Sequence, residues 1–172
     1  MRTSAGFPRR PSIRLRSFDY SSRAAYFITI CSLERKCLFS RIVDGYVLLS
    51  PIGKIIEREL VASPAKRPGL VIDEYQVMPN HLHFTCFLPA SPSPGEMPRQ
   101  RKRAPRSLGS FIGGYKAAVT SAVRELVGDP DFEVWQARYF DHVVRDQDDM
   151  DRIREYIREN PLRWEEDELF VR

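Results

Sequence analysis

Cysteine and long apolar segments are both scarce in this chain of 172 residues. Its three cysteines, Cys31, Cys37 and Cys86, are an odd number with no CxxC spacing, which argues against a disulfide framework and a cysteine-based zinc site. No apolar run approaches the roughly 18 residues that a membrane-spanning helix needs. The N-terminus also lacks the apolar stretch of a secretory signal. We therefore expect a cytoplasmic protein with reduced thiols.

Positive charge is present in modest excess, with a formal net charge of +4, which permits a nucleic-acid partner without requiring one. Basic residues gather in an N-terminal arm, residues 1–20, and in a proline-rich loop, residues 89–106. Such runs are often plain solvated surface, but both flank structured segments and could neutralise DNA phosphates. The predicted DNA-binding residues are Arg9, Arg10, Arg14, Arg16, Lys102 and Arg103.

Hydrophobic periodicity predicts one domain covering residues 1–172, with strands and helices in alternation. Strands are expected at 25–31, within 41–49, and at 70–78, 81–88 and 135–144. Helices are expected from Pro51 to Pro64, from Leu108 to Gly128, and from Asp146 to about Asn160. This order favours an α+β fold: a ferredoxin-like sandwich with a mainly antiparallel sheet and helices on one side.

The most informative segment is MPNHLHF, residues 78–84, in which a proline turn precedes a strand. Because strand side chains alternate, His81 and His83 should share one face while Leu82 and Phe84 share the other. Two imidazoles about 6.6 Å apart along a strand can hold one metal ion. Structural histidines within the fold are the alternative interpretation.

The final predicted helix carries Tyr156 and Asn160, which are four residues apart and so lie on one helical face. Asn160 could give its side-chain oxygen to a metal, and Tyr156 could present its phenol to a phosphate bound there. However, Tyr156 borders an apolar stripe, and Asn160 precedes Pro161 where the helix should end. Core packing and capping therefore stay open on spacing alone.

Three segments together resemble a known family: VMPNHLHF at 77–84, VWQARYFDHVVRD at 134–146 and REYIRENP at 154–161. They are similar to the signature segments of the single-tyrosine HUH transposases of insertion sequences. The nearest branch is that of the REP-associated tyrosine transposases. The likeness runs from about residue 10 to 164 and includes SIRLRSFDYS and SLGSFIGGYKAAVT. The HLH segment alone is moderately specific, whereas the three segments in this order are strongly so.

This resemblance implies an HUH endonuclease-like fold and a role for each matching residue. His81 and His83 correspond to the paired metal ligands, Tyr156 to the nucleophile, and Asn160 to the third ligand. Relatives can have glutamine at the last position, so asparagine changes the reach of that ligand. The implied cofactor is a divalent ion, Mg²⁺ or Mn²⁺. The implied reaction nicks and rejoins hairpin-containing single-stranded DNA through a 5′-phosphotyrosine, without ATP.

Several alternatives remain open on the sequence. The chain could be an inactive, domesticated hairpin-binding protein, a nuclease in which water attacks, or a structural module. Tyr115 and Tyr139 compete for the nucleophile role, although Tyr115 lies on the apolar face of its helix. His142 could be a structural residue or a further polar group near the site. The expected partner is single-stranded DNA with REP-like hairpins, and both a monomer and a homodimer are compatible.

Overall fold

A four-stranded antiparallel sheet lies at the centre of the structure, a computed structural model that describes residues 25–88 and 107–171. The strand order is β4-β5-β1-β6, and all three neighbouring pairs are antiparallel. The strands are β1 (Ala25–Cys31), β4 (Val71–Val77), β5 (His81–Phe87) and β6 (Phe140–Val143). The predicted arm and loop, with the six predicted DNA-binding residues, lie outside the described residues.

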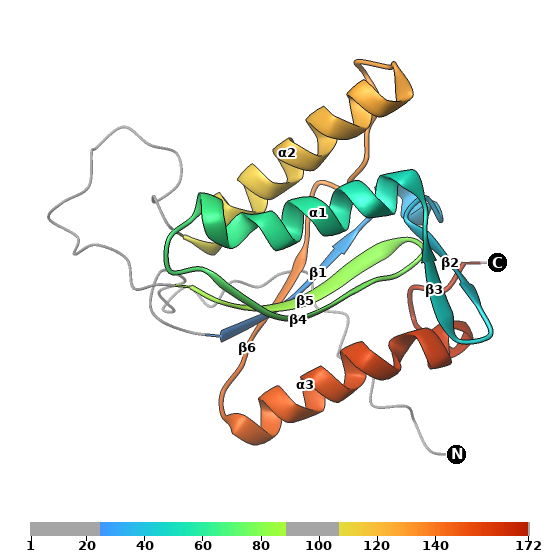
Figure 1. Cartoon of the computed structure of the whole chain (residues 1–172). Helices are drawn as coiled ribbons and strands as arrows, with labels where there is room; N and C mark the ends of the chain where they lie inside the picture. The colour runs from blue at the N-terminus through green and yellow to red at the C-terminus, as the bar shows by residue number, and fades with distance from the viewer. Residues whose placement is uncertain (1–24, 89–106, 172) are drawn as a thin grey trace, which may run out of the picture.

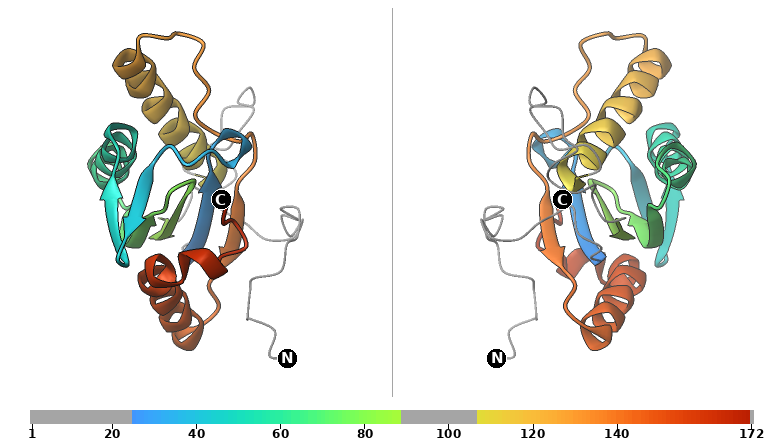
Figure 2. Two further views of the ribbon diagram at one scale, coloured as in Figure 1. Left: turned by 90° about the vertical axis from the view of Figure 1, so that its right-hand side faces the viewer. Right: turned by 90° about the vertical axis from the view of Figure 1, so that its left-hand side faces the viewer.

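Two helices, α1 (Pro51–Lys66) and α2 (Leu108–Val127), cover one face of this sheet (Figures 1 and 2). A separate hairpin of β2 (Ser40–Val43) and β3 (Tyr46–Leu49) precedes α1. Without that hairpin, the chain order is the βαββαβ of a ferredoxin-like sandwich. The predicted α+β class with its mainly antiparallel sheet is confirmed, and both helices of the sandwich lie on one side of the sheet as predicted.

A third helix, α3 (Gln147–Glu159), follows this sandwich and lies on the opposite face of the sheet (Figures 1 and 2). Asp146 caps its start, because the carboxylate accepts a hydrogen bond from Asp149 N at 2.8 Å. A 3-10 segment, Asn160–Glu166, follows directly and contains Pro161. The helix therefore begins and ends where the sequence predicted.

Side chains on the central strands alternate between two buried layers. Leu82 and Phe84 belong to the main core beneath α1 and α2, where Phe84 meets Phe111 edge-on. On the other face, Phe27 packs with Ile153 and Ile157 of α3. His83 stacks on Phe27 with ring centroids 5.3 Å apart. The predicted alternation is confirmed, and it places both histidines between the sheet and α3.

Two predicted boundaries are wrong. Helix α1 continues past Pro64 to Lys66, and Arg67 N closes its last turn by donating to the Pro64 carbonyl at 3.2 Å. The strand expected at 135–144 is regular only in β6, with an isolated bridge between Trp135 and Ser32. Between these points, Lys116 Nζ donates to the carbonyls of residues 136 and 138, which replaces strand pairing there.

Among residues 25–88 and 107–171, no helix combines the length and the apolar character that crossing a bilayer requires.

Candidate active site

Side chains from three segments converge in the layer between the sheet and α3. His81 and His83 come from β5, Tyr156 comes from α3, and Asp167 follows the 3-10 segment. The Nε2 atoms of the two histidines are 2.8 Å apart. Candidate ligand atoms of His81, His83 and Asp167 all lie within 4.8 Å of one another. The structure thus brings together the predicted histidines and tyrosine, and adds one carboxylate.

Asn80 fixes the orientation and the tautomer of His81. Its Nδ2 donates to the carbonyls of Arg35 at 3.2 Å and Leu169 at 2.7 Å, so its Oδ1 is the atom that faces His81 Nδ1 at 2.8 Å. An amide oxygen only accepts, so Nδ1 of His81 carries the proton and Nε2 presents a lone pair. This arrangement of an outer partner and a ring nitrogen is typical of metal-binding histidines.

His83 is held from the neighbouring strand, because Thr29 Oγ1 lies 2.8 Å from its Nδ1. Burial lowers the pKa of His83 to about 4, although the charge of Asp167 acts in the opposite direction. Burial, with a contribution from His83, also lowers the pKa of His81 well below its usual value. Both imidazoles are therefore neutral near pH 7, the form in which histidine binds a metal.

Asn160 is buried at the point where α3 ends. Its Nδ2 donates to Asp167 Oδ2 at 2.7 Å, while its Oδ1 is a buried acceptor without a hydrogen-bond partner among the described residues. Leaving a buried acceptor unpaired costs free energy unless something binds it. Two neutral imidazoles, a carboxylate and this amide oxygen form a donor set that fits a divalent metal ion.

The phenol of Tyr156 lies against the same cluster. Its oxygen is 3.4 Å from His83 Nε2 and donates to Asp167 Oδ2 at 3.4 Å. Phe27 meets the tyrosine ring edge-on at 6.0 Å. Burial, followed by the charge of Asp167, raises the pKa of Tyr156 well above its usual value. The phenol is therefore protonated here, and its activation requires a positive charge nearby and an acceptor for its proton.

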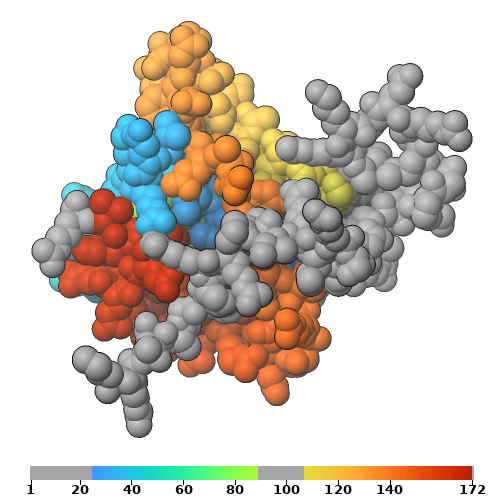
Figure 3. Space-filling model, turned by 180° about the vertical axis from the view of Figure 1, so that it is seen from behind, coloured from blue at the N-terminus to red at the C-terminus, as the bar shows by residue number. Residues whose placement is uncertain are grey.

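Sequence reasoning missed Asp167. It belongs to an acidic run at 165–168 that shows no periodicity, so nothing in the pattern distinguishes it from a solvated surface charge. In the structure, Leu169 N donates to Asp167 Oδ1 at 2.6 Å, which orients the carboxylate toward Asn160 and Tyr156. Figure 3 shows the C-terminal segment in red at the surface, beside residues that follow β1, in light blue.

The other candidate side chains lie elsewhere. Tyr115 is buried in the main core and donates to the Ile56 carbonyl at 2.9 Å, which confirms its predicted packing role. Tyr139 packs partly buried against the same core. His142 Nε2 lies 2.9 Å from Asp149 Oδ2 in the first turn of α3. His142 therefore contacts the start of the helix, whereas the cluster lies near the end of it.

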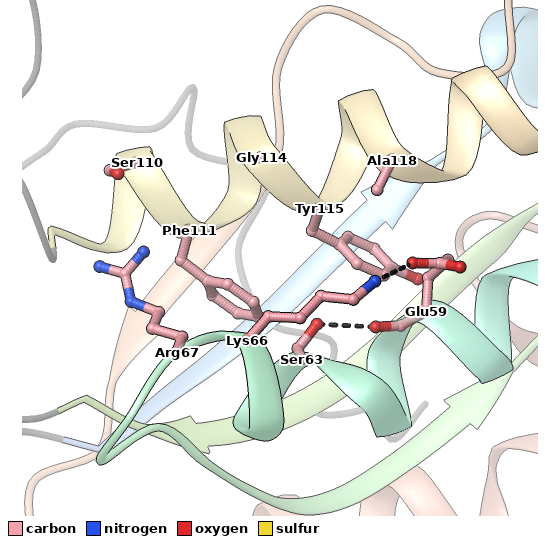
Figure 4. A pocket seen from close by; sticks show the side chains of 9 residues that line it. All are labelled: Glu59, Ser63, Lys66, Arg67, Ser110, Phe111, Gly114, Tyr115 and Ala118. Carbon is pink, nitrogen blue, oxygen red and sulfur yellow. Dashed lines mark hydrogen bonds and ion pairs between the residues drawn. The ribbon is translucent and has the colours of Figure 1, made fainter.

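A hollow of about 270 Å³ lies between α1 and α2, on the opposite side of the sheet from the histidines (Figure 4). Lys66 pairs with Glu59 there at 2.6 Å, and Ser63 donates to the Glu59 carbonyl at 2.7 Å. Arg67 donates to the Ser107 carbonyl at 3.2 Å. The polar side chains around this hollow thus have hydrogen-bond partners within the protein. They form no cluster of potential metal ligands like the one around the histidines.

Comparison with known proteins places the chain in a family. No family model matches it. It is 36% identical over 178 residues to an uncharacterised protein of Haemophilus influenzae, and the match covers 98% of this chain and 97% of that protein. The chain belongs to the family of that Haemophilus protein.

Comparison with solved structures shows the fold. A REP-associated tyrosine transposase bound to a REP hairpin is 20% identical, with a TM-score of 0.58, over 92% of this chain and 74% of that one. The family of the Haemophilus protein therefore has a transposase-like fold. The roles of individual residues stay predictions.

Proposed function

We propose that this protein is a transposase of the single-tyrosine HUH type: a metal-dependent enzyme that nicks and rejoins hairpin-containing single-stranded DNA. The observation that carries the proposal is the position of the Tyr156 phenol, 3.4 Å from the Nε2 atom of His83 in a buried pair of histidines. A nucleophile beside a potential metal site is what phosphoryl transfer through a covalent intermediate requires.

His81, His83 and Asn160 would hold the metal, and Asp167 offers a further oxygen beside them. When bound, Mg²⁺ or Mn²⁺ would polarise the scissile phosphate and stabilise the charge that develops on its oxygens. The tautomer that Asn80 imposes on His81 leaves a lone pair directed into the cluster. Neutral histidines and an unpaired amide oxygen support this assignment.

Tyr156 attacks the phosphorus through its phenolic oxygen. A new bond forms between that oxygen and the phosphorus, and the bond from phosphorus to the 3′ oxygen of the preceding nucleotide breaks. Asp167 Oδ2, to which the phenol donates, receives the phenolic proton. The departing 3′ oxygen takes a proton from solvent, so the products are a 5′-phosphotyrosine and a 3′-hydroxyl. Because the covalent link retains the bond energy, rejoining needs no ATP.

Single-stranded DNA with a hairpin, such as a REP-like repeat, is the proposed partner. The solved relative in fold is bound to a REP hairpin. The two basic segments of this chain, residues 1–20 and 89–106, would neutralise phosphates on either side of the hairpin. The reaction takes place where genomic DNA is accessible, in the cytoplasm, with the protein as a monomer or a homodimer.

The test is a denaturing-gel assay with labelled single-stranded hairpins from the flanks of the gene, in Mn²⁺ or EDTA. Wild type runs beside Tyr156→Phe, His81→Ala and the control Tyr139→Phe, which removes a competing phenol. We expect an SDS-resistant protein–DNA band in Mn²⁺ that disappears in EDTA, in Tyr156→Phe and in His81→Ala, and that persists in the control.

Other outcomes would contradict the proposal in distinct ways. Cleaved DNA without a covalent band, produced equally by Tyr156→Phe, would indicate a nuclease in which water attacks. Hairpin binding without cleavage in Mn²⁺ would indicate a hairpin-binding protein. A covalent band that persists in Tyr156→Phe and disappears in Tyr139→Phe would show that Tyr139, and not Tyr156, is the nucleophile.

A further inference from the structure

Strand β4 contains a bulge opposite α3. Its pairing with β5 shifts between Ile72, which pairs with Cys86, and Tyr75, which pairs with Phe84. Three steps along β4 thus match two along β5, so one extra residue is inserted. Thr85 secures the bulge, because its Oγ1 accepts from Glu74 N at 3.0 Å.

The bulge directs two consecutive carboxylates toward the same helix, whereas a regular strand would alternate them. Asp73 accepts two hydrogen bonds from Arg154 of α3, both of 2.8 Å. Glu74 accepts two from Arg158, of 2.9 and 2.6 Å. Because these arginines are four residues apart, they lie one turn from each other on the helix. We call this set of four residues the β4–α3 clamp.

Helix α3 packs on the sheet through an apolar stripe, and the clamp and Tyr156 lie on opposite sides of this stripe. Residues advance by about 100° around a helix, so Ile153 and Ile157 lie about 60° and 100° from Tyr156 on its buried side. Arg154 and Arg158 lie about 160° from Tyr156, beyond the isoleucines. The tyrosine therefore borders the histidines, while the arginines border the edge strand β4.

An apolar stripe alone constrains the rotation of a helix about its own axis weakly, since isoleucine contacts are not directional. A rotation of about 10° moves an atom about 6 Å from the axis by roughly 1 Å. Misplacement of a reacting group by about 1 Å can slow a reaction on the order of 10²-fold. The ion pairs on the far flank, in which Arg154 binds both carboxylate oxygens of Asp73 and Arg158 donates twice to Oε2 of Glu74, have the directionality that opposes such a rotation.

We propose that Asp73, Glu74, Arg154 and Arg158 are positioning residues, which fix the rotation of α3 and thereby hold the Tyr156 phenol beside the histidines. This inference rests on the proposed function for its catalytic consequence, although the clamp itself is a feature of the fold. The side chains of Arg154 and Arg158 are 27% and 64% exposed. Exposed ion pairs contribute little to global stability, so the clamp acts mainly on the position of the helix.

The test is a charge-swap cycle on the more exposed pair. The variants are Arg158→Glu, Glu74→Arg and the double swap. Arg152→Glu is the matched control, because it reverses the same charge on the same helix, whereas the ion pair of Arg152 among residues 25–88 and 107–171 is with Asp149 of α3 itself. Three quantities are measured: hairpin affinity, the single-turnover rate of the covalent band at saturating DNA, and amide hydrogen exchange of α3 without DNA or metal.

We expect each single reversal to slow covalent-band formation by about 10- to 100-fold. Hairpin affinity should change by no more than in the control, α3 should exchange faster, and the double swap should recover at least part of both losses. Unchanged exchange of β1 and β5 would show that the fold is retained. If a reversal unfolds the protein, Arg158→Gln gives the same comparison.

Two results would overturn the inference. If the double swap recovers nothing and affinity falls in Arg158→Glu, the arginines bind DNA phosphates instead of positioning the helix. If the rate and the exchange of α3 stay at wild-type values in the single reversals, the clamp positions nothing. If wild type forms no covalent band, the proposed function fails. In that case α3 exchange alone decides on the clamp: faster exchange restored by the swap supports it, and unchanged exchange contradicts it.

Discussion

Acidification in the absence of metal should destabilise this protein well above the pH at which carboxylates titrate. His81 and His83 are almost fully buried, and burial lowers the pKa of His83 to about 4 from a usual value of 6.5. Between these values the unfolded chain binds a proton at this residue and the folded chain does not. Stability therefore falls as the pH decreases through that window. The lowered pKa of His81 acts in the same direction.

The size of the effect follows from the shift of His83 alone. The two values of its pKa differ by 6.5 − 4, or about 2.5, and each pKa unit corresponds to about 1.4 kcal/mol. The full loss is about 3 kcal/mol, and roughly 2 kcal/mol of it should be lost between pH 7.5 and pH 5. A small domain has a total stability of about 5–15 kcal/mol, so the change is large enough to measure.

The assay is urea unfolding followed by circular dichroism at four pH values from 7.5 to 5, in EDTA. Wild type should lose stability steadily over this range, and His83→Gln should lose less, because only His81 of the buried pair remains. The control His142→Gln, which removes the third histidine and keeps the buried pair, should resemble wild type. Constant stability of wild type across the range, or an equally steep loss in His83→Gln, would refute the assignment of neutral buried histidines.

Three further predictions concern metal affinity, packing and the clamp. Asn80→Ala should weaken Mn²⁺ binding by about 10- to 100-fold, measured by calorimetry, because it removes the outer partner of a ligand; equal affinity would contradict its orienting role. Gly53→Ala should lower the free energy of unfolding by about 1–3 kcal/mol, since a Cβ there would lie 2.0 Å from the Phe39 carbonyl oxygen; wild-type urea unfolding would contradict this. Arg154 lowers the pKa of Asp73, so wild type should be more stable to unfolding than Asp73→Asn above about pH 4. This difference in stability should shrink as the pH falls further; a constant difference in thermal unfolding would disprove the prediction.

The sequence predicts the parts of the site that depend on a regular repeat. Strand alternation places His81 and His83 together, and helical spacing places Tyr156 and Asn160 on one helical face. Only the family resemblance associates that face with the histidines. The fold class follows in the same way, from the order and period of its elements. These inferences succeed because the backbone of a strand or a helix determines the directions of its side chains. Metal binding, the identity of the metal and the chemistry of Tyr156 stay predictions.

Features that depend on irregular backbone could not be predicted. Asp167 reaches the cluster only because the chain turns back after Pro161 through a short 3-10 segment, and no period in the sequence indicates that path. The bulge that points Asp73 and Glu74 at one helix is equally absent from the pattern of VIDEYQV. Lys116 likewise binds the carbonyls of residues that were expected to form a strand.

One residue connects the regular and the irregular parts of the site. Asn80, in the turn before β5, accepts from His81 and donates to the carbonyl of Leu169, two residues beyond Asp167. The same amide therefore orients a histidine and holds the segment that carries the carboxylate. A displacement of the C-terminal segment would remove the shorter of the two hydrogen bonds that orient the amide of Asn80, and would thereby weaken the constraint on the tautomer of His81. The potential metal ligands on β5 and Asp167 are thus coupled through a single side chain, although 86 positions separate His81 from Asp167 in the sequence.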